Sequence, residues 1–343
     1  MRRTILAVGA VAAVSVLLSG CLYVSGNFTV VGPPGAAFAA YDAGDPGAVP
    51  FPPGNSAIQV YTTNDFWGGK HVPSWTWNVP SSEIDYFDAL PTGPSWDTSN
   101  QYWAPSVRHV GPTNNYIMAF AGEDGSSGRF CIGFAESTNG PNNPFTALPN
   151  EICAVGGVNS NIDPYLFSND GTLYLLWSNE HFNNSGQAAI WSQPLTVSGT
   201  GPGTVISFAP GSSEQDLMTY TTAAGIASAG NSGFDPGPSA YVENPSVVYQ
   251  PSVGYDVMAS VGTYFGNYWT VEETCGSLTD PGSCSGGYVV SHFGSMSMLY
   301  DDDPIPEAND NDAFFSLCYG TCQLNPFATA FNPRFVVEQS SGT

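Results

Sequence analysis

Four strand-like segments of this chain begin at a proline-marked signature, and the signatures recur at related intervals. The signatures are Asp45-Pro46, Trp103-Ala104-Pro105, Ile162-Asp163-Pro164 and Glu243-Asn244-Pro245. They start near residues 45, 103, 163 and 243, so the steps are 58, 60 and 80 residues. An alternating apolar run, a turn and a second, aromatic-rich run follow, which is typical of paired strands. Repeats of this period, each holding several strands, predict the blades of an all-β propeller.

The longest step contains residues 200–238, which are rich in glycine, serine and proline. We expect this segment to be a loop insertion, because convincing helical periodicity is absent after the N-terminal region.

The N-terminus is typical of an export signal. Arg2 and Arg3 precede an apolar stretch over residues 5–18, which is too short to span a membrane. The stretch ends in Leu18-Ser19-Gly20-Cys21, which resembles a bacterial lipobox. We predict a signal peptide over residues 1–20, a lipidated Cys21 and a single domain over residues 22–343. An ordinary signal peptide with an incidental cysteine is the alternative. The protein is then expected outside the cell, at the cell surface, and held to the membrane only by its lipid anchor.

Six cysteines remain after Cys21, and they lie in three local pairs. An exported chain meets an oxidising environment, which favours disulfides. We expect Cys131–Cys153, Cys275–Cys284 and Cys318–Cys322, although six cysteines allow 15 pairings. The cysteines and histidines show no zinc-site spacing, so no metal centre is predicted.

The chain is strongly acidic. Without the two signal arginines it has four basic against 29 acidic residues, a net charge of −25. Such a surface repels phosphate backbones and polyanionic polysaccharides, which argues against nucleic acid as a partner. Neutral polysaccharides or oligosaccharides remain compatible, and we expect the protein to act as a monomer.

Three of the signatures carry a carboxylate, namely Asp45, Asp163 and Glu243. Residues at corresponding strand starts ring one mouth of a propeller channel, so the three acids could converge there. Paired carboxylates with separate protonation states are what hydrolysis of a glycosidic bond requires. Aspartate before proline is also a common way to open a turn, which is the structural alternative for any one of them.

The signatures together resemble glycoside hydrolase family 43, over residues 45–292. The most specific match is Ile162-Asp163-Pro164-Tyr165-Leu166-Phe167 followed by Tyr174-Leu175-Leu176-Trp177. The resemblance implies a five-bladed β-propeller that hydrolyses arabinan, arabinoxylan or xylan with inversion and without an organic cofactor. It implies that Asp45 is the general base, that Asp163 raises the pKa of the acid and orients it, and that Glu243 is the general acid.

Two departures from the family pattern keep other functions open. Asn244 stands where the family usually has a small residue, and no fifth blade is evident in the sequence. A carbohydrate-binding propeller without catalysis is one alternative, and a related retaining fructan-type hydrolase is another. Trp103 is expected either to stack on a sugar ring or to pack between blades.

The C-terminal part carries the weakest pattern. Residues 301–312 are acidic and could bind calcium, but they lack the sixth-position glycine of an EF-hand loop. We therefore interpret them as a solvated loop, and a structural calcium is possible there but not supported. The family's late histidine, a frequent ligand of a central cation, is not evident. Either the segment 22–33, with strand-like Asn27–Val31, completes the last sheet, or the chain is truncated or degenerate there.

Overall fold

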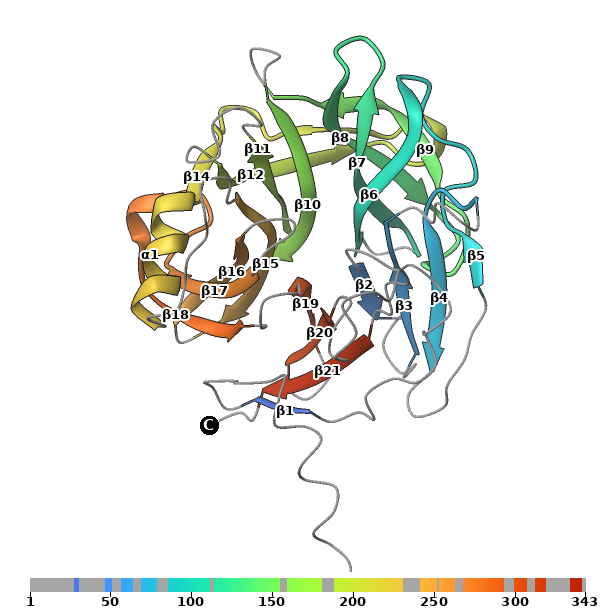
Figure 1. The fold of residues 1–343 in the computed structure, drawn as a ribbon. Helices are drawn as coiled ribbons and strands as arrows, with labels where there is room; N and C mark the ends of the chain where they lie inside the picture. The colour runs from blue at the N-terminus through green and yellow to red at the C-terminus, as the bar shows by residue number, and fades with distance from the viewer. Residues whose placement is uncertain are drawn as a thin grey trace, which may run out of the picture.

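The described strands form five antiparallel sheets arranged around a common axis (Figure 1). The structure is a computed structural model that describes residues 28–30, 47–50, 57–63, 69–78, 86–111, 114–154, 159–180, 188–230, 241–251, 253–262, 268–292, 299–306, 312–318 and 334–340. For residues 28–30 and from residue 290 onward, it describes the backbone.

In each of the first four sheets, the strands follow one another in chain order from the axis outward. The first comprises β2 (Gly47–Pro50), β3 (Ala57–Tyr61), β4 (Pro73–Asn78) and β5 (Tyr86–Asp88). The second comprises β6 (Asp97–His109), β7 (Tyr116–Asp124), β8 (Arg129–Ser137) and β9 (Thr146–Ile152). The third comprises β10 (Ser160–Asn169), β11 (Thr172–Glu180), β12 (Ala189–Ser198) and β13 (Val205–Phe208), with β14 (Gln215–Thr219) also paired to β12. The fourth comprises β15 (Tyr241–Gln250), β16 (Gly254–Gly262), β17 (Tyr268–Cys275) and β18 (Cys284–His292).

The fifth sheet joins the first described strand to the last three. It runs from β19 (Leu299–Pro306) through β20 (Asp312–Cys318) and β21 (Arg334–Ser340) to β1 (Phe28–Val30). β1 pairs with β21, with Phe28 opposite Ser340. β19 contacts both β15 and β2, so the ring of inner strands β2, β6, β10, β15 and β19 is closed. The prediction that an N-terminal strand completes the last sheet is confirmed.

Residues 301–306 of the acidic segment form a strand and not the solvated loop that we expected for residues 301–312. Asp301, Asp302 and Asp303 belong to β19, the innermost strand of the fifth sheet. The pairing with β20 shifts register between Tyr300 and Asp303. Strand pairing is made by backbone groups, so an acidic run that lacks apolar alternation can still occupy a strand.

The predicted loop insertion over residues 200–238 contains regular structure instead. It holds β13, β14 and the helix α1 (Tyr220–Gly230). The Thr219 side-chain oxygen accepts a hydrogen bond from the Thr222 N–H and so caps the helix. Ala223 and Ala227 lie four residues apart and are both buried, and α1 contacts β17 and β18. An 11-residue helix whose buried face is made of alanine leaves only a weak periodic signal in the sequence.

The core lies between neighbouring sheets, in three apolar clusters that separate the first sheet from the second, the second from the third and the third from the fourth. In β11, Leu175 packs toward the second sheet, whereas Leu176 packs toward the fourth. Continuous apolar runs such as Leu173–Trp177 are the result, since successive side chains point to opposite buried faces.

Two of the three predicted disulfides are present among the described residues. Cys131–Cys153 ties β8 to the end of β9, with a Cα–Cα distance of 4.4 Å. Cys275–Cys284 joins β17 to β18, with a Cα–Cα distance of 3.9 Å. The third predicted pair involves Cys322, which lies outside the described residues, as do Cys21 and the signal segment. In the part of the chain that the structure describes, no helix is long and apolar enough to cross a membrane.

The fourth sheet carries a buried acidic pair, Glu272 and Asp256, which are 5% and 6% exposed. Burial, and next the charge of Asp256, raise the pKa of Glu272 to about 7, while a hydrogen bond from Tyr288 acts in the opposite direction. The folded state therefore holds a proton that the unfolded state releases near pH 4.5. The raised pKa of Glu272 therefore lowers the free energy of unfolding as the pH rises from about 4.5 to about 7.

Glu272→Gln should remove this cost. We expect the free energy of unfolding of the variant to exceed that of the wild type by about 3 kcal/mol above pH 7, and by little near pH 4.5. Denaturant unfolding between pH 4.5 and 8 measures the difference. Glu214→Gln, at an exposed position, is the matched control. A gain in the free energy of unfolding of Glu272→Gln that does not vary with pH would contradict the raised pKa of Glu272.

Candidate active site

Three inner strands break their pairing at the same point of their sequence signature. The register shifts between Trp103 and Ser106 in β6, between Ile162 and Tyr165 in β10, and between Glu243 and Ser246 in β15. The skipped residues are Ala104-Pro105, Asp163-Pro164 and Asn244-Pro245.

The residue before each of these prolines has a left-handed backbone. The φ values are 46° for Ala104, 51° for Asp163 and 53° for Asn244. Non-glycine residues adopt this conformation at a cost, least for aspartate and asparagine, and such strain clusters at functional sites. The recurrent signature is therefore a recurrent bulge that turns three inner strands at equivalent positions.

The bulges of β10 and β15 bring two predicted site residues together. The backbone N–H of Asn244 donates a hydrogen bond to Oδ2 of Asp163, at 3.1 Å. Asp163 and Glu243 are each 7% exposed. Since Asn244 directly follows Glu243, the Asp163 carboxylate lies against the peptide that carries Glu243, although the two acids are 80 residues apart in sequence.

Asp45 lies outside the described residues, but the strand that follows it is placed. β2 begins at Gly47, which pairs with Tyr61. A Cβ atom built on Gly47 would lie 1.9 Å from the carbonyl oxygen of Pro105. At Gly47, two residues after Asp45, the backbone of β2 therefore packs directly against the backbone of the β6 bulge.

Trp103 is half-buried and packs against the core. Its ring stacks on Phe130, with centroids 4.0 Å apart and an interplanar angle of 24°. It also contacts the apolar cluster between the second and third sheets. Of the two expectations for Trp103, this contact supports packing between blades.

Asn244 occupies the bulge position that Asp163 occupies in the preceding sheet. It is 4% exposed, and its side-chain Nδ2 makes no hydrogen bond within the described part of the chain. The sequence marked Asn244 as unusual, and the register agrees with the proline-aligned signatures that Asn244 corresponds to Asp163. Glu243 therefore stands one residue earlier, where β10 has Ile162.

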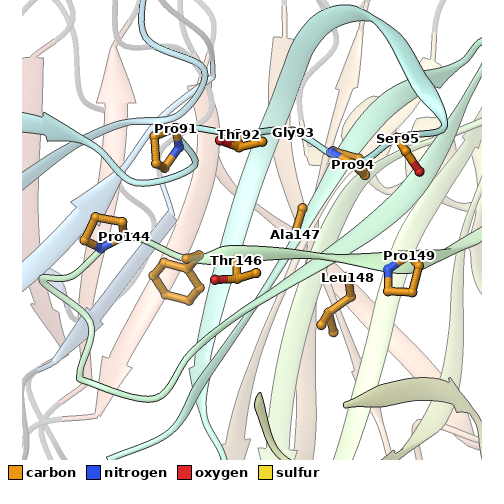
Figure 2. A pocket seen from close by; sticks show the side chains of 11 residues that line it. Pro91, Thr92, Gly93, Pro94, Ser95, Pro144, Thr146, Ala147, Leu148 and Pro149 are labelled. Atoms are coloured by element: carbon orange, nitrogen blue, oxygen red, sulfur yellow. The ribbon is translucent and has the colours of Figure 1, made fainter. Parts of the chain in front are cut away.

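A surface groove of about 400 Å³ lies elsewhere, between the loop Pro91–Ser95 and the segment Pro144–Pro149 (Figure 2). Its lining contains prolines, threonines, a serine, Phe145 and Leu148, and no titratable side chain. Acid–base chemistry needs titratable groups, so we place the candidate active site at the bulges of the inner strands and not in this groove.

One group of potential metal ligands occurs among the described side chains, formed by Cys131, Glu151 and Cys153. The two cysteines form a disulfide, so they offer no thiolate to a metal ion.

Five sheets around a common axis, with bulges at equivalent positions of three inner strands, define a β-propeller. The model of the glycosyl hydrolases family 43 matches residues 82–281, which is more than half of the chain. The protein therefore belongs to family 43, whose members are inverting glycosidases that need no cofactor.

Several solved structures share the fold. An exo-β-1,3-galactanase from Phanerochaete chrysosporium aligns with a TM-score of 0.58 and 18% identity, over 91% of this chain and 64% of that chain. An exo-1,5-α-L-arabinanase from a bovine ruminal metagenomic library aligns with a TM-score of 0.57 and 14% identity, over 88% and 94%. An endo-arabinase from Bacteroides thetaiotaomicron aligns with a TM-score of 0.56 and 14% identity, over 90% and 96%. The chain thus spans less than two thirds of the galactanase. A comparison with curated protein sequences found no match.

Proposed function

We propose that the protein hydrolyses neutral plant-type polysaccharides or their oligosaccharides by a single displacement that inverts the anomeric carbon. The observation that carries this proposal is the contact between the Asp163 carboxylate and the peptide that follows Glu243, in a chain of family 43. Arabinan, arabinoxylan and xylan are the leading substrates. The galactanase among the structural neighbours adds β-1,3-galactan to the set worth testing.

Each acid has one role in the proposed reaction. Asp45 takes a proton from water while that water attacks the anomeric carbon. Glu243 gives its proton to the departing glycosidic oxygen as the carbon–oxygen bond breaks. A negative charge beside a buried carboxyl group favours its protonated form, which is the role we propose for Asp163 towards Glu243. A water must fit between base and acid, so their carboxyl groups should be about 6.5–9.5 Å apart.

The charge of the chain supports a neutral substrate. The predicted mature form carries four basic and 29 acidic residues, and such a surface repels polyanions. The same reasoning keeps nucleic acid out of the proposal. Export, lipidation of Cys21, location at the cell surface and a monomeric state complete the proposal and rest on the sequence.

Reducing-sugar release tests this function. The purified chain, incubated with arabinan, arabinoxylan, xylan, β-1,3-galactan and a polyuronate, should release sugar from at least one neutral polymer and none from the polyuronate. Binding on a glycan array without release from any polymer would favour the non-catalytic alternative. The absence of a recognisable fifth blade was one reason for that alternative, and the fifth sheet removes it.

A further inference from the structure

Polar contacts join the inner strands of neighbouring sheets. Each inner strand pairs by its backbone with the second strand of its own sheet. Between sheets, the N–H of Leu166 in β10 donates to the Ser106 hydroxyl in β6, at 2.9 Å, and the N–H of Asn244 in β15 donates to Asp163 in β10. The spacing of the bulges, and so of the acids on them, depends on such contacts.

A second set of contacts joins the same three strands farther along β6, β10 and β15. Arg108 in β6 donates from Nη2 to the hydroxyl oxygen of Tyr165 at 2.7 Å, and from Nη1 to the carbonyl oxygen of Val107 at 3.0 Å. The guanidinium carbon lies 4.9 Å from the centroid of the Tyr165 ring. The Tyr165 hydroxyl in turn donates to the carbonyl oxygen of Val247 in β15, at 3.5 Å.

This bridge is partly buried and directional. Tyr165 is 1% exposed, whereas Arg108 is half-buried, and a buried hydroxyl that loses a partner costs free energy. A guanidinium group is planar and always charged, so it holds the Tyr165 hydroxyl in one orientation. Tyr165 lies two residues after Asp163, and Val247 lies four residues after Glu243. The bridge therefore joins β10 and β15 a few residues beyond the two acids.

We propose that Arg108 is a positioning residue for catalysis, acting through Tyr165 to hold β10 and β15 at the spacing that Asp163 and Glu243 require. The inference rests on the proposed function of the site. The apolar clusters between the sheets hold the fold itself together, so loss of the bridge should change the geometry of the acids more than the stability of the domain. A misplacement of about 1 Å can cost a rate factor of about 100.

Arg108→Met tests the proposal, because methionine keeps much of the side-chain length without charge or donors. We expect kcat on the best glycan to fall about 10- to 100-fold, with KM changed less than about twofold and the melting temperature close to that of the wild type. Arg129→Met removes the same charge from β8 and is the matched control, with kcat expected to stay at the wild-type value. A rise in KM at constant kcat would overturn the proposal, since it would indicate direct contact of Arg108 with substrate.

Tyr165→Phe separates positioning from a general effect of charge, because it removes only the hydroxyl. If Arg108 acts through this hydroxyl, Tyr165→Phe should reproduce the loss of kcat, and the double variant should be no slower than either single variant. Multiplying losses would overturn the proposal. An inactive wild type would overturn the proposed function and this inference together. An active wild type with an unaffected Arg108→Met variant would overturn only the inference.

Discussion

Replacing Glu243 by glutamine is expected to reduce polysaccharide hydrolysis by a factor of about 1,000, within the range of about 100 to 10,000 that general acid catalysis contributes. Glutamine has nearly the same shape as glutamic acid but holds no proton to give to the leaving oxygen. Glu243 lies in β15, one residue before the bulge whose N–H is bound by Asp163, so the variant should keep the fold. Initial rates on the best polymer, with circular dichroism as a check of folding, measure the effect.

The choice of substrate shows whether the loss comes from acid catalysis. A 2,4-dinitrophenyl glycoside has a leaving group that departs without protonation, so Glu243→Gln should retain far more activity on it than on the polymer. Glu214→Gln, at an exposed position, should match the wild type on both substrates. An equal loss on both substrates would show that Glu243 is not the general acid, and an unchanged rate on the polymer would remove it from the mechanism.

Gly47→Ala is expected to destabilise the domain by about 3 kcal/mol, at the upper end of the usual cost of overpacking. The added methyl carbon would lie 1.9 Å from the Pro105 carbonyl oxygen and 3.0 Å from its carbonyl carbon. These atoms are backbone, so no side-chain rotation can relieve the contact, and β2 must move away from β6. Because Asp45 lies two residues before Gly47, activity should fall along with stability.

Gly225→Ala is the matched control for this substitution. Gly225 lies in α1, and a Cβ atom there would meet nothing within 4 Å. Alanine should therefore be neutral or stabilise by up to about 1 kcal/mol, because glycine is a poor helix former. Chemical denaturation of both variants measures the difference. Equal stabilities of Gly47→Ala and the wild type would mean that β2 and β6 do not approach each other as described.

Local sequence rules predicted much of the fold. The proline-marked signatures identify the inner strands, but they lie at bulges inside β6, β10 and β15 rather than at the predicted strand starts. Proline interrupts the backbone ladder, and short polar side chains tolerate a left-handed backbone. The strand character of Phe28–Val30 and the local cysteine pairs were also visible in the sequence. These features depend on neighbouring residues, and sequence patterns report such neighbours well.

Features that depend on distant partners were not predictable. The pattern of alternating apolar and polar residues did not predict β19, because the acidic run Asp301–Asp303 shows no apolar face. Helical hydrophobic periodicity did not predict α1, because small residues form its buried face. The position of Trp103 is decided by Phe130, and that of Arg108 by Tyr165, which is 57 residues away. No signal in either local segment identifies such a partner.

We propose that acids from separate sheets form one inverting centre. Proton NMR of the first product formed by the wild type, before the free sugar equilibrates its anomers, is the decisive measurement. We expect the first-formed reducing sugar to have the anomeric configuration opposite to that of the cleaved bond. A first product of the same configuration as the cleaved bond would contradict the roles proposed for Asp45, Asp163 and Glu243.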